Sequence, residues 1–91
     1  MVTVMITIEV SDFLEWKKIF DANEPIRQQI NIKQKMILIS IENPDRITMI
    51  LEAKNKDHFH HFFYNDHLVK KAIEKYGFLF PPLVEYYNKL Q

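Results

Sequence analysis

Alternating apolar and polar positions open the chain and predict a β-strand over residues 2–10. Residues 34–42 are rich in isoleucine and predict a second strand, and residues 46–54 (RITMILEAK) predict a third. The sequence Asn-Pro-Asp at 43–45 is typical of a turn, because proline presets φ and the Asn and Asp side chains bond the local backbone. These two strands therefore form a hairpin, and residues 83–87 predict a short fourth strand.

Between the first two strands, the apolar residues change to helical spacing. Aromatic and aliphatic side chains recur at intervals that place them on one helix face: Phe13, Trp16, Ile19 and Phe20. Asp12 with Glu15 fits a capping box at the helix start. We expect this helix to run to about residue 23 and to resume past Pro25, since proline is tolerated in a first helical turn.

A second helical region follows the hairpin. Asn55 or Asp57 is expected to cap its first stretch, residues 58–65. An Asn-Asp pair then interrupts the pattern, and a second stretch over residues 67–76 ends at Gly77, because glycine is favoured just past a helix C-terminus.

The element order is therefore β-α-β-β-α-β, which places the chain in the α+β class. Packing two helices against one face of a four-stranded antiparallel sheet is the economical arrangement of such elements. Ninety-one residues supply one hydrophobic core, so we expect a single ferredoxin-like domain over residues 1–91.

The sheet face away from the helices carries many apolar residues for a surface in contact with water. It keeps Met5 and, if the isoleucines of the second strand face the helices, Met36 and Leu38. Ile50 joins them in one of the two possible orientations of the third strand. A second copy packed sheet to sheet would cover this face in a homodimer, whereas the alternative is a monomer with an apolar outer face.

Composition narrows the possible partners. Twelve basic and twelve acidic residues cancel, which gives no electrostatic basis for binding nucleic acid or an anionic membrane. Cysteine is absent and Gly77 is the only glycine, which excludes thiolate metal sites and phosphate-cradling loops. Without a basic leader or an apolar run near the roughly 20 residues of a membrane span, we expect a cytoplasmic protein with no membrane partner and no cofactor.

Four segments carry a resemblance to known proteins: residues 10–21 (VSDFLEWKKIFD), the turn at 43–45, residues 57–63, and residues 67–82 with their glycine and paired prolines. Together they resemble the dimeric α/β-barrel superfamily, which includes antibiotic-biosynthesis-monooxygenase-like (ABM-like) and small cyclase-like proteins. The resemblance implies a ferredoxin-like domain that pairs into a dimeric α/β barrel. Members of the superfamily often carry an Arg-x-x-Gly-like element after the first helix, whereas Arg27 is followed here by Gln-Gln-Ile, so the glycine is missing.

Candidate chemistry centres on one histidine and several aromatic residues. His67 lies at the break between the helical stretches, beside Asp66, whose carboxylate can orient an imidazole. If the helices and sheet enclose a cleft, His67 would transfer protons and four aromatic residues would bind substrate: Trp16, Phe20, Phe62 and Phe63. The alternatives are a surface position for His67 and a core position for Trp16.

Few residues are candidates for binding a charged group of a substrate or a metal ion. Arg27 is either a partner for a substrate carboxylate or a solvated loop cation. With its phenylalanines on the core face, the 58–65 helix points His61 away and places His58 and His60 on its flanks. We interpret these three as solvated or flanking side chains and expect no metal site, although His58 and His61 are spaced for weak chelation.

Two functions of different class remain. The first is a dimeric ABM-like protein, a cofactor-free monooxygenase- or cyclase-like enzyme that acts on a small, partly apolar organic molecule. The second is a non-enzymatic ligand-binding or assembly module.

Overall fold

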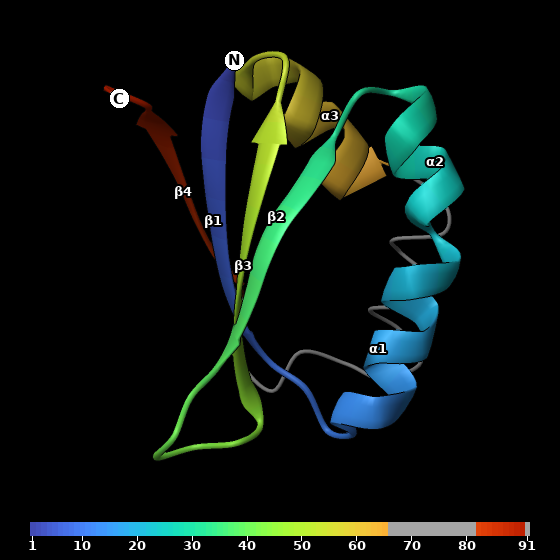
Figure 1. Cartoon of the computed structure of the whole chain (residues 1–91), viewed down its shortest axis with the longest axis vertical. Coiled ribbons are helices and arrows are strands. Elements are labelled where there is room, and N and C mark those ends of the chain that lie inside the picture. Colours follow the sequence, from blue (N-terminus) through green and yellow to red (C-terminus); the bar gives the residue numbers. More distant parts are fainter. Residues whose placement is uncertain (66–81, 91) are drawn as a thin grey trace.

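The protein is seen in a computed structural model that describes residues 1–65 and 82–90. Figure 1 shows the arrangement of its elements, which follow the chain in this order: β1 (Val2–Glu9), α1 (Phe13–Ala22), α2 (Glu24–Gln29), β2 (Lys33–Ile39), β3 (Arg46–Ala53), α3 (Lys56–Asn65) and β4 (Leu83–Asn88). The predicted helical stretch over residues 67–76 lies outside the described residues.

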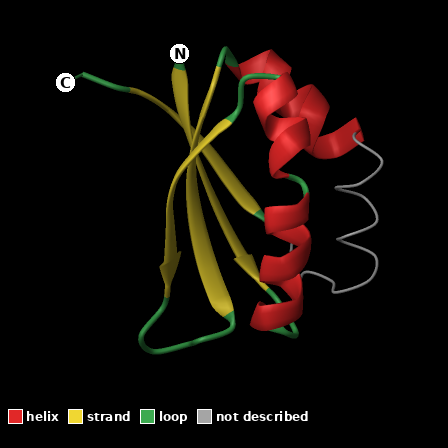
Figure 2. Cartoon of the chain, turned by 45° about the vertical axis from the view of Figure 1, so that its right-hand side comes forward, coloured by secondary structure: helices red, strands yellow, loops and turns green. Residues whose placement is uncertain are grey.

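One four-stranded sheet forms the frame of the molecule. Its strands lie in the order β2-β3-β1-β4, and every neighbouring pair is antiparallel. The two central strands are therefore β3 and β1, as the ferredoxin-like connection requires, and the predicted fold class is confirmed. Figure 2 shows α1, α2 and α3 on one side of this sheet, while no described element covers the other side.

The core lies between the sheet and the helices. Alternate residues of the central strands face it, so their exposure follows the period of two that the sequence shows. Most of the buried apolar residues come from both central strands and from α1 and α3, among them Val4, Ile6, Ile8, Ile47, Met49, Leu51, Trp16, Phe59 and Phe63. This register leaves Thr48, Ile50 and Glu52 on the outer face and settles the orientation of the third strand.

Local caps start both long helices. Asp12 precedes α1, and its Oδ1 accepts a hydrogen bond from the Glu15 backbone N–H at 3.1 Å. Asn55 precedes α3, and its Oδ1 accepts from the His58 backbone N–H at 2.7 Å. The N-cap is therefore Asn55, while Asp57 lies within the first turn of α3. None of the described helices is long and apolar enough to cross a membrane.

The second strand is shorter than the sequence predicts. It ends at Ile39, and the predicted residues 40–42 belong to the loop of the hairpin. The reason is local bonding, because Ser40 Oγ accepts from the Asn43 backbone N–H at 3.1 Å and Asn43 Oδ1 accepts from the Asp45 backbone N–H at 3.2 Å. Such side-chain bonds give the backbone an alternative to the sheet ladder, and Ile41 is left fully in solvent.

Candidate functional site

The aromatic residues of α1 form a stack against the sheet. Trp16 is 6% exposed, and its ring lies 5.2 Å from the Phe20 ring and 6.0 Å from the Phe13 ring, measured between centroids. Phe20 is half-buried and contacts Trp16 in a nearly parallel arrangement. Of the two positions open to Trp16, the structure therefore supports the core.

The phenylalanines of α3 form a second aromatic group. Phe59 is fully enclosed, and its ring lies 5.8 Å from Phe63 and 6.3 Å from Phe62. Tyr86 of β4 meets the Phe59 ring edge-on at 6.2 Å. Phe63 is buried with Phe59, whereas Phe62 is half-buried. Of the four predicted substrate-binding aromatics, Trp16 and Phe63 are thus core residues, whereas Phe20 and Phe62 are half-buried and pack against the core.

The histidines of α3 occupy different environments. His60 and His61 are exposed, whereas His58 is half-buried with its Nε2 2.7 Å from the carbonyl oxygen of Ile30. This contact joins α3 to the end of α2. Within residues 1–65 and 82–90, no group of three or more His, Cys, Asp or Glu side chains is placed to hold a metal ion. His67, the predicted proton-transfer group, lies outside the described residues.

Arg27 is the buried charged residue of the described chain. It lies on α2, is 4% exposed, and donates a hydrogen bond from Nη1 to the carbonyl oxygen of Phe20 at 2.7 Å. Its guanidinium carbon sits 3.8 Å from the centroid of the Phe20 ring, a cation–π contact. Burial lowers the pKa of Arg27, while the carboxylates of Glu24 and Asp21 oppose that shift. Arg27 is therefore not a solvated loop cation.

A half-open depression of about 360 Å³ lies beside Arg27, where α2 meets the start of β2. Its lining is mostly polar or charged: Glu24, Arg27, Gln28, Asn31, Ile32, Lys33, Gln34 and Lys35. Asn31 holds a φ of 58° and reverses the chain between the two elements, a conformation that asparagine tolerates better than most residues. The sequence patterns did not predict this site. Two features of the sequence could have indicated it: an asparagine at position 31, where the chain reverses, and the run Lys-Gln-Lys at 33–35, close to Arg27.

The outer face of the sheet is a broad surface with an apolar centre. Met5 and Ile50 occupy its middle, on the paired central strands. Four large apolar side chains on the edge strands keep about half of their area in solvent: Met36 (49%), Leu38 (46%), Leu83 (53%) and Tyr87 (45%). The predicted placement of Met5, Met36, Leu38 and Ile50 on this face is confirmed.

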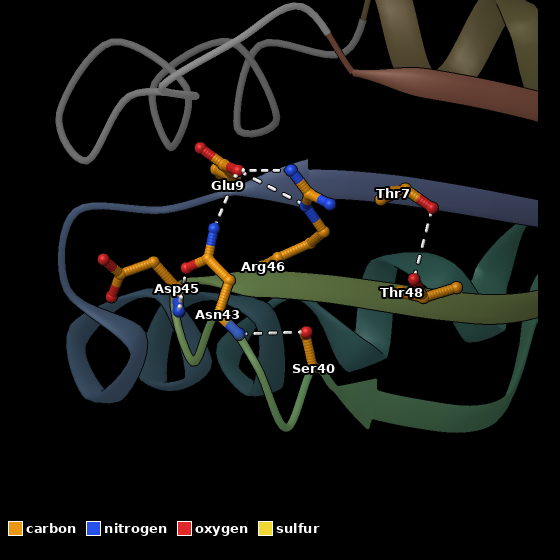
Figure 3. A network of polar contacts seen from close by, with 7 residues as sticks. All are labelled: Thr7, Glu9, Ser40, Asn43, Asp45, Arg46 and Thr48. Atoms are coloured by element: carbon orange, nitrogen blue, oxygen red, sulfur yellow. Dashed lines mark hydrogen bonds and ion pairs between the residues drawn. The ribbon is translucent and has the colours of Figure 1, made fainter.

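Polar contacts close one end of this face, as Figure 3 shows. Glu9 Oε1 accepts from Arg46 Nη2 at 2.9 Å and from the Asn43 side-chain amide at 3.1 Å. One step inward, the hydroxyl oxygens of Thr7 and Thr48 lie 3.2 Å apart across the two central strands. These cross-strand pairs fix the register of β1 against β3 and the position of the hairpin loop.

Charge also marks the opposite end of the outer face. Lys35 forms an ion pair with Glu52 at 3.0 Å, next to the irregular pairing between Gln34 and Met36. The hydrogen bond from Lys35 lowers the pKa of Glu52, and the positive charges of Lys89 and Lys33 add to that effect. The apolar centre thus lies between two charged ends.

Comparisons with known proteins bear on the fold. No family model and no curated protein matches the sequence. A candidate antibiotic biosynthesis monooxygenase from Bordetella bronchiseptica matches in structure with a TM-score of 0.77 and 18% identity, covering 99% of this chain and 97% of that one. A second, from Nitrosomonas europaea, gives 0.72 and 14% identity over 100% of both chains. This chain has the fold of the ABM-like proteins.

A third neighbour is described by its assembly. It is a dimeric ferredoxin-like protein from an uncultured marine organism, with a TM-score of 0.58 and 13% identity over 100% of this chain and 96% of that one. The resemblance predicted from the sequence segments is therefore confirmed at the level of the fold, over the whole chain. At these sequence identities, the structural matches show the fold of this chain, and its activity has to be argued from the residues of the site.

Proposed function

We propose that this chain works as a homodimer paired through its outer sheet face, and that each protomer takes up a small, partly apolar organic molecule for monooxygenase- or cyclase-like chemistry. The proposed homodimer is supported mainly by the apolar residues on the outer face of the sheet. The chemistry is supported by the names of the structural neighbours, several of which are candidate antibiotic biosynthesis monooxygenases.

Hydrophobic burial supplies a driving force for pairing. Covering the exposed half of a large apolar side chain contributes roughly 1 kcal/mol. Four such side chains lie on the edge strands of one protomer, and a two-fold symmetric contact presents the same four from its partner. In Figure 2 no described element lies over the outer face, which leaves it accessible to a second sheet. A dimeric ferredoxin-like neighbour supports the same state of assembly.

Leu38→Lys tests the interface, with Leu14→Lys as its matched control. Leu38 lies on the outer face, whereas Leu14 is 71% exposed on α1, on the helical side of the molecule. Light scattering after gel filtration should give the wild type and Leu14→Lys twice the chain mass of 11.0 kDa. Leu38→Lys should elute with the mass of one chain, because the contact would bury two unpaired ammonium groups. Equal masses for both variants would contradict the proposed interface.

His67 is the residue we propose for proton transfer in the chemical step. An imidazole changes protonation near neutral pH and serves as general acid or base. We propose that the exposed parts of the Phe20 and Phe62 rings, on α1 and α3, contact the apolar part of the substrate, and their half-buried positions support this. Oxygen uptake with a panel of small phenols, with mass spectrometry of the products, measures the activity. We expect uptake by the wild type and its loss in His67→Ala, with His61→Ala active as a control. Equal rates with His67→Ala would rule out that role.

A second candidate is a non-enzymatic ligand-binding or assembly module. The burial of Trp16 and Phe63 favours it, because two of the rings expected in a pocket are core residues. This function predicts that His67→Ala and Trp16→Phe leave biological activity intact, while Leu38→Lys abolishes it. A catalytic protein would lose activity in His67→Ala and keep its assembly.

A further inference from the structure

Arg27 has more hydrogen-bonding capacity than its described surroundings use. A guanidinium carries several N–H donors, and among the described residues only the bond to the Phe20 carbonyl engages them. No described carboxylate forms an ion pair with Arg27. Arg27 also lines the depression, and its remaining nitrogen atoms are not among the described atoms that are fully enclosed without a partner.

A buried and underbonded cation favours an anionic ligand. Removing a charge from water is costly unless hydrogen bonds or an opposite charge compensate. For Arg27, one carbonyl and one aromatic ring compensate only in part, and the carboxylates of Glu24 and Asp21 favour the charge without forming an ion pair with it. Phe20 holds the guanidinium from one side, which fixes its orientation before a ligand arrives. Such preorganisation lowers the entropic cost of binding.

The lining of the depression specifies the class of anion. Lys33 adds an exposed ammonium group that forms no ion pair within the described chain, while Lys35 is engaged by Glu52. The side chains of Gln28, Asn31 and Gln34 supply amide donors and acceptors, and Ile32 is the apolar member of the lining. A polar ligand fits this lining better than the partly apolar molecule of the proposed function. The volume of about 360 Å³ is at the small end of ligand sites.

One acidic side chain limits the charge of the ligand. Glu24 lines the same depression one turn before Arg27, so a dianion would meet more repulsion than a monoanion. The planar guanidinium fork also matches the two oxygens of a carboxylate. We propose that this depression binds a small, polar organic monocarboxylate, held by Arg27 and attracted by Lys33.

Solution NMR of the full chain with sodium L-lactate tests this site. The sequence holds two arginines, so the Nε–H signals of Arg27 and Arg46 can be told apart by one variant. At constant ionic strength, lactate should shift the Arg27 signal and the amides of residues 24–35 in a saturable way, while Arg46 stays unmoved. Methyl lactate, which lacks the carboxylate, should cause no such shift, and inorganic phosphate should bind more weakly.

Variants distinguish lactate binding in the depression from nonspecific binding of lactate to charged residues elsewhere on the surface. Arg27→Gln should weaken lactate binding roughly tenfold or more, because a charged hydrogen bond is lost. Lys33→Gln, on the exposed rim, should weaken it by a smaller factor and keep the fold, so it remains informative if Arg27→Gln does not fold. Arg46→Gln should bind as the wild type does. The Leu38→Lys variant should also bind normally, because the site does not depend on the dimer.

Three results would overturn the proposal. The first is an absence of saturable shifts with lactate in the wild type. The second is tighter binding of phosphate than of lactate. The third is equal weakening by Arg46→Gln and by the Arg27 and Lys33 variants.

Discussion

Truncating Phe59 tests the packing of α3 against the sheet. Its side chain is 0% exposed and contacts the rings of Phe62, Phe63 and Tyr86 at centroid distances of 6.3, 5.8 and 6.2 Å. Phe59→Ala removes a whole ring from a site enclosed on every side, so it loses both transfer free energy and packing contacts. We expect the free energy of unfolding to fall by about 3–5 kcal/mol. For a chain of this length, with a total stability of roughly 5–14 kcal/mol, that loss is large.

Urea denaturation followed by circular dichroism measures the change. Phe62→Ala is the matched control, because Phe62 lies on the same helix in the same aromatic group but is half-buried. Phe62→Ala should lower the free energy of unfolding by less than half as much as Phe59→Ala. In both variants the slope of that free energy against urea concentration should equal the wild-type slope. If Phe59→Ala costs under about 1.5 kcal/mol, or no more than Phe62→Ala, the described packing of α3 is wrong.

Two further predictions concern local electrostatics and capping. Asp12→Ala should lower the free energy of unfolding by about 1 kcal/mol, because the Glu15 backbone N–H loses its acceptor; an unchanged urea midpoint would argue against the cap. Lys35→Met should raise the pKa of Glu52, measured by NMR titration of its carboxyl carbon, because the bond that lowers it is removed. A depressed folded-state pKa stabilises the fold above the unfolded-state pKa, and the benefit disappears as the pH falls through the folded-state value. An equal Glu52 pKa in both proteins would contradict the ion pair.

Much of the sheet could be predicted from local patterns, because alternation of apolar and polar residues along a strand indicates which face is buried. In β1 the period of two is uninterrupted, so the alternation alone assigns Met5 to the outer face. On β3 both faces contain apolar residues, and only the pairing of Met5 with Ile50 distinguishes them. The strand end at Ile39 was not predictable from hydrophobicity, because Ser40 and Asn43 terminate the ladder with side-chain bonds.

The candidate sites were less predictable than the sheet. Arg27 was a candidate from its charge alone, but its burial depends on Phe20, seven residues earlier, which places a ring and a carbonyl against the guanidinium. The depression also needs the chain reversal at Asn31, which brings Lys33 close to α2. A contact between a helix and a strand does not repeat at a fixed spacing along the chain, so the hydrophobic pattern of the sequence does not predict it. The same holds for His58, whose partner is a backbone carbonyl at residue 30.

The proposed dimer interface can be tested directly by NMR. In a mixed sample, one half of the chains carries ¹³C-labelled methyl groups and the other half is unlabelled. Nuclear Overhauser effects filtered for contacts between chains report which side chains meet in the assembly. Pairing through the sheet predicts contacts among the methyl groups of the outer face, from Met5, Met36, Leu38 and Ile50. Contacts confined to the helical side, such as those of Leu14, or no contacts between chains at all, would contradict it.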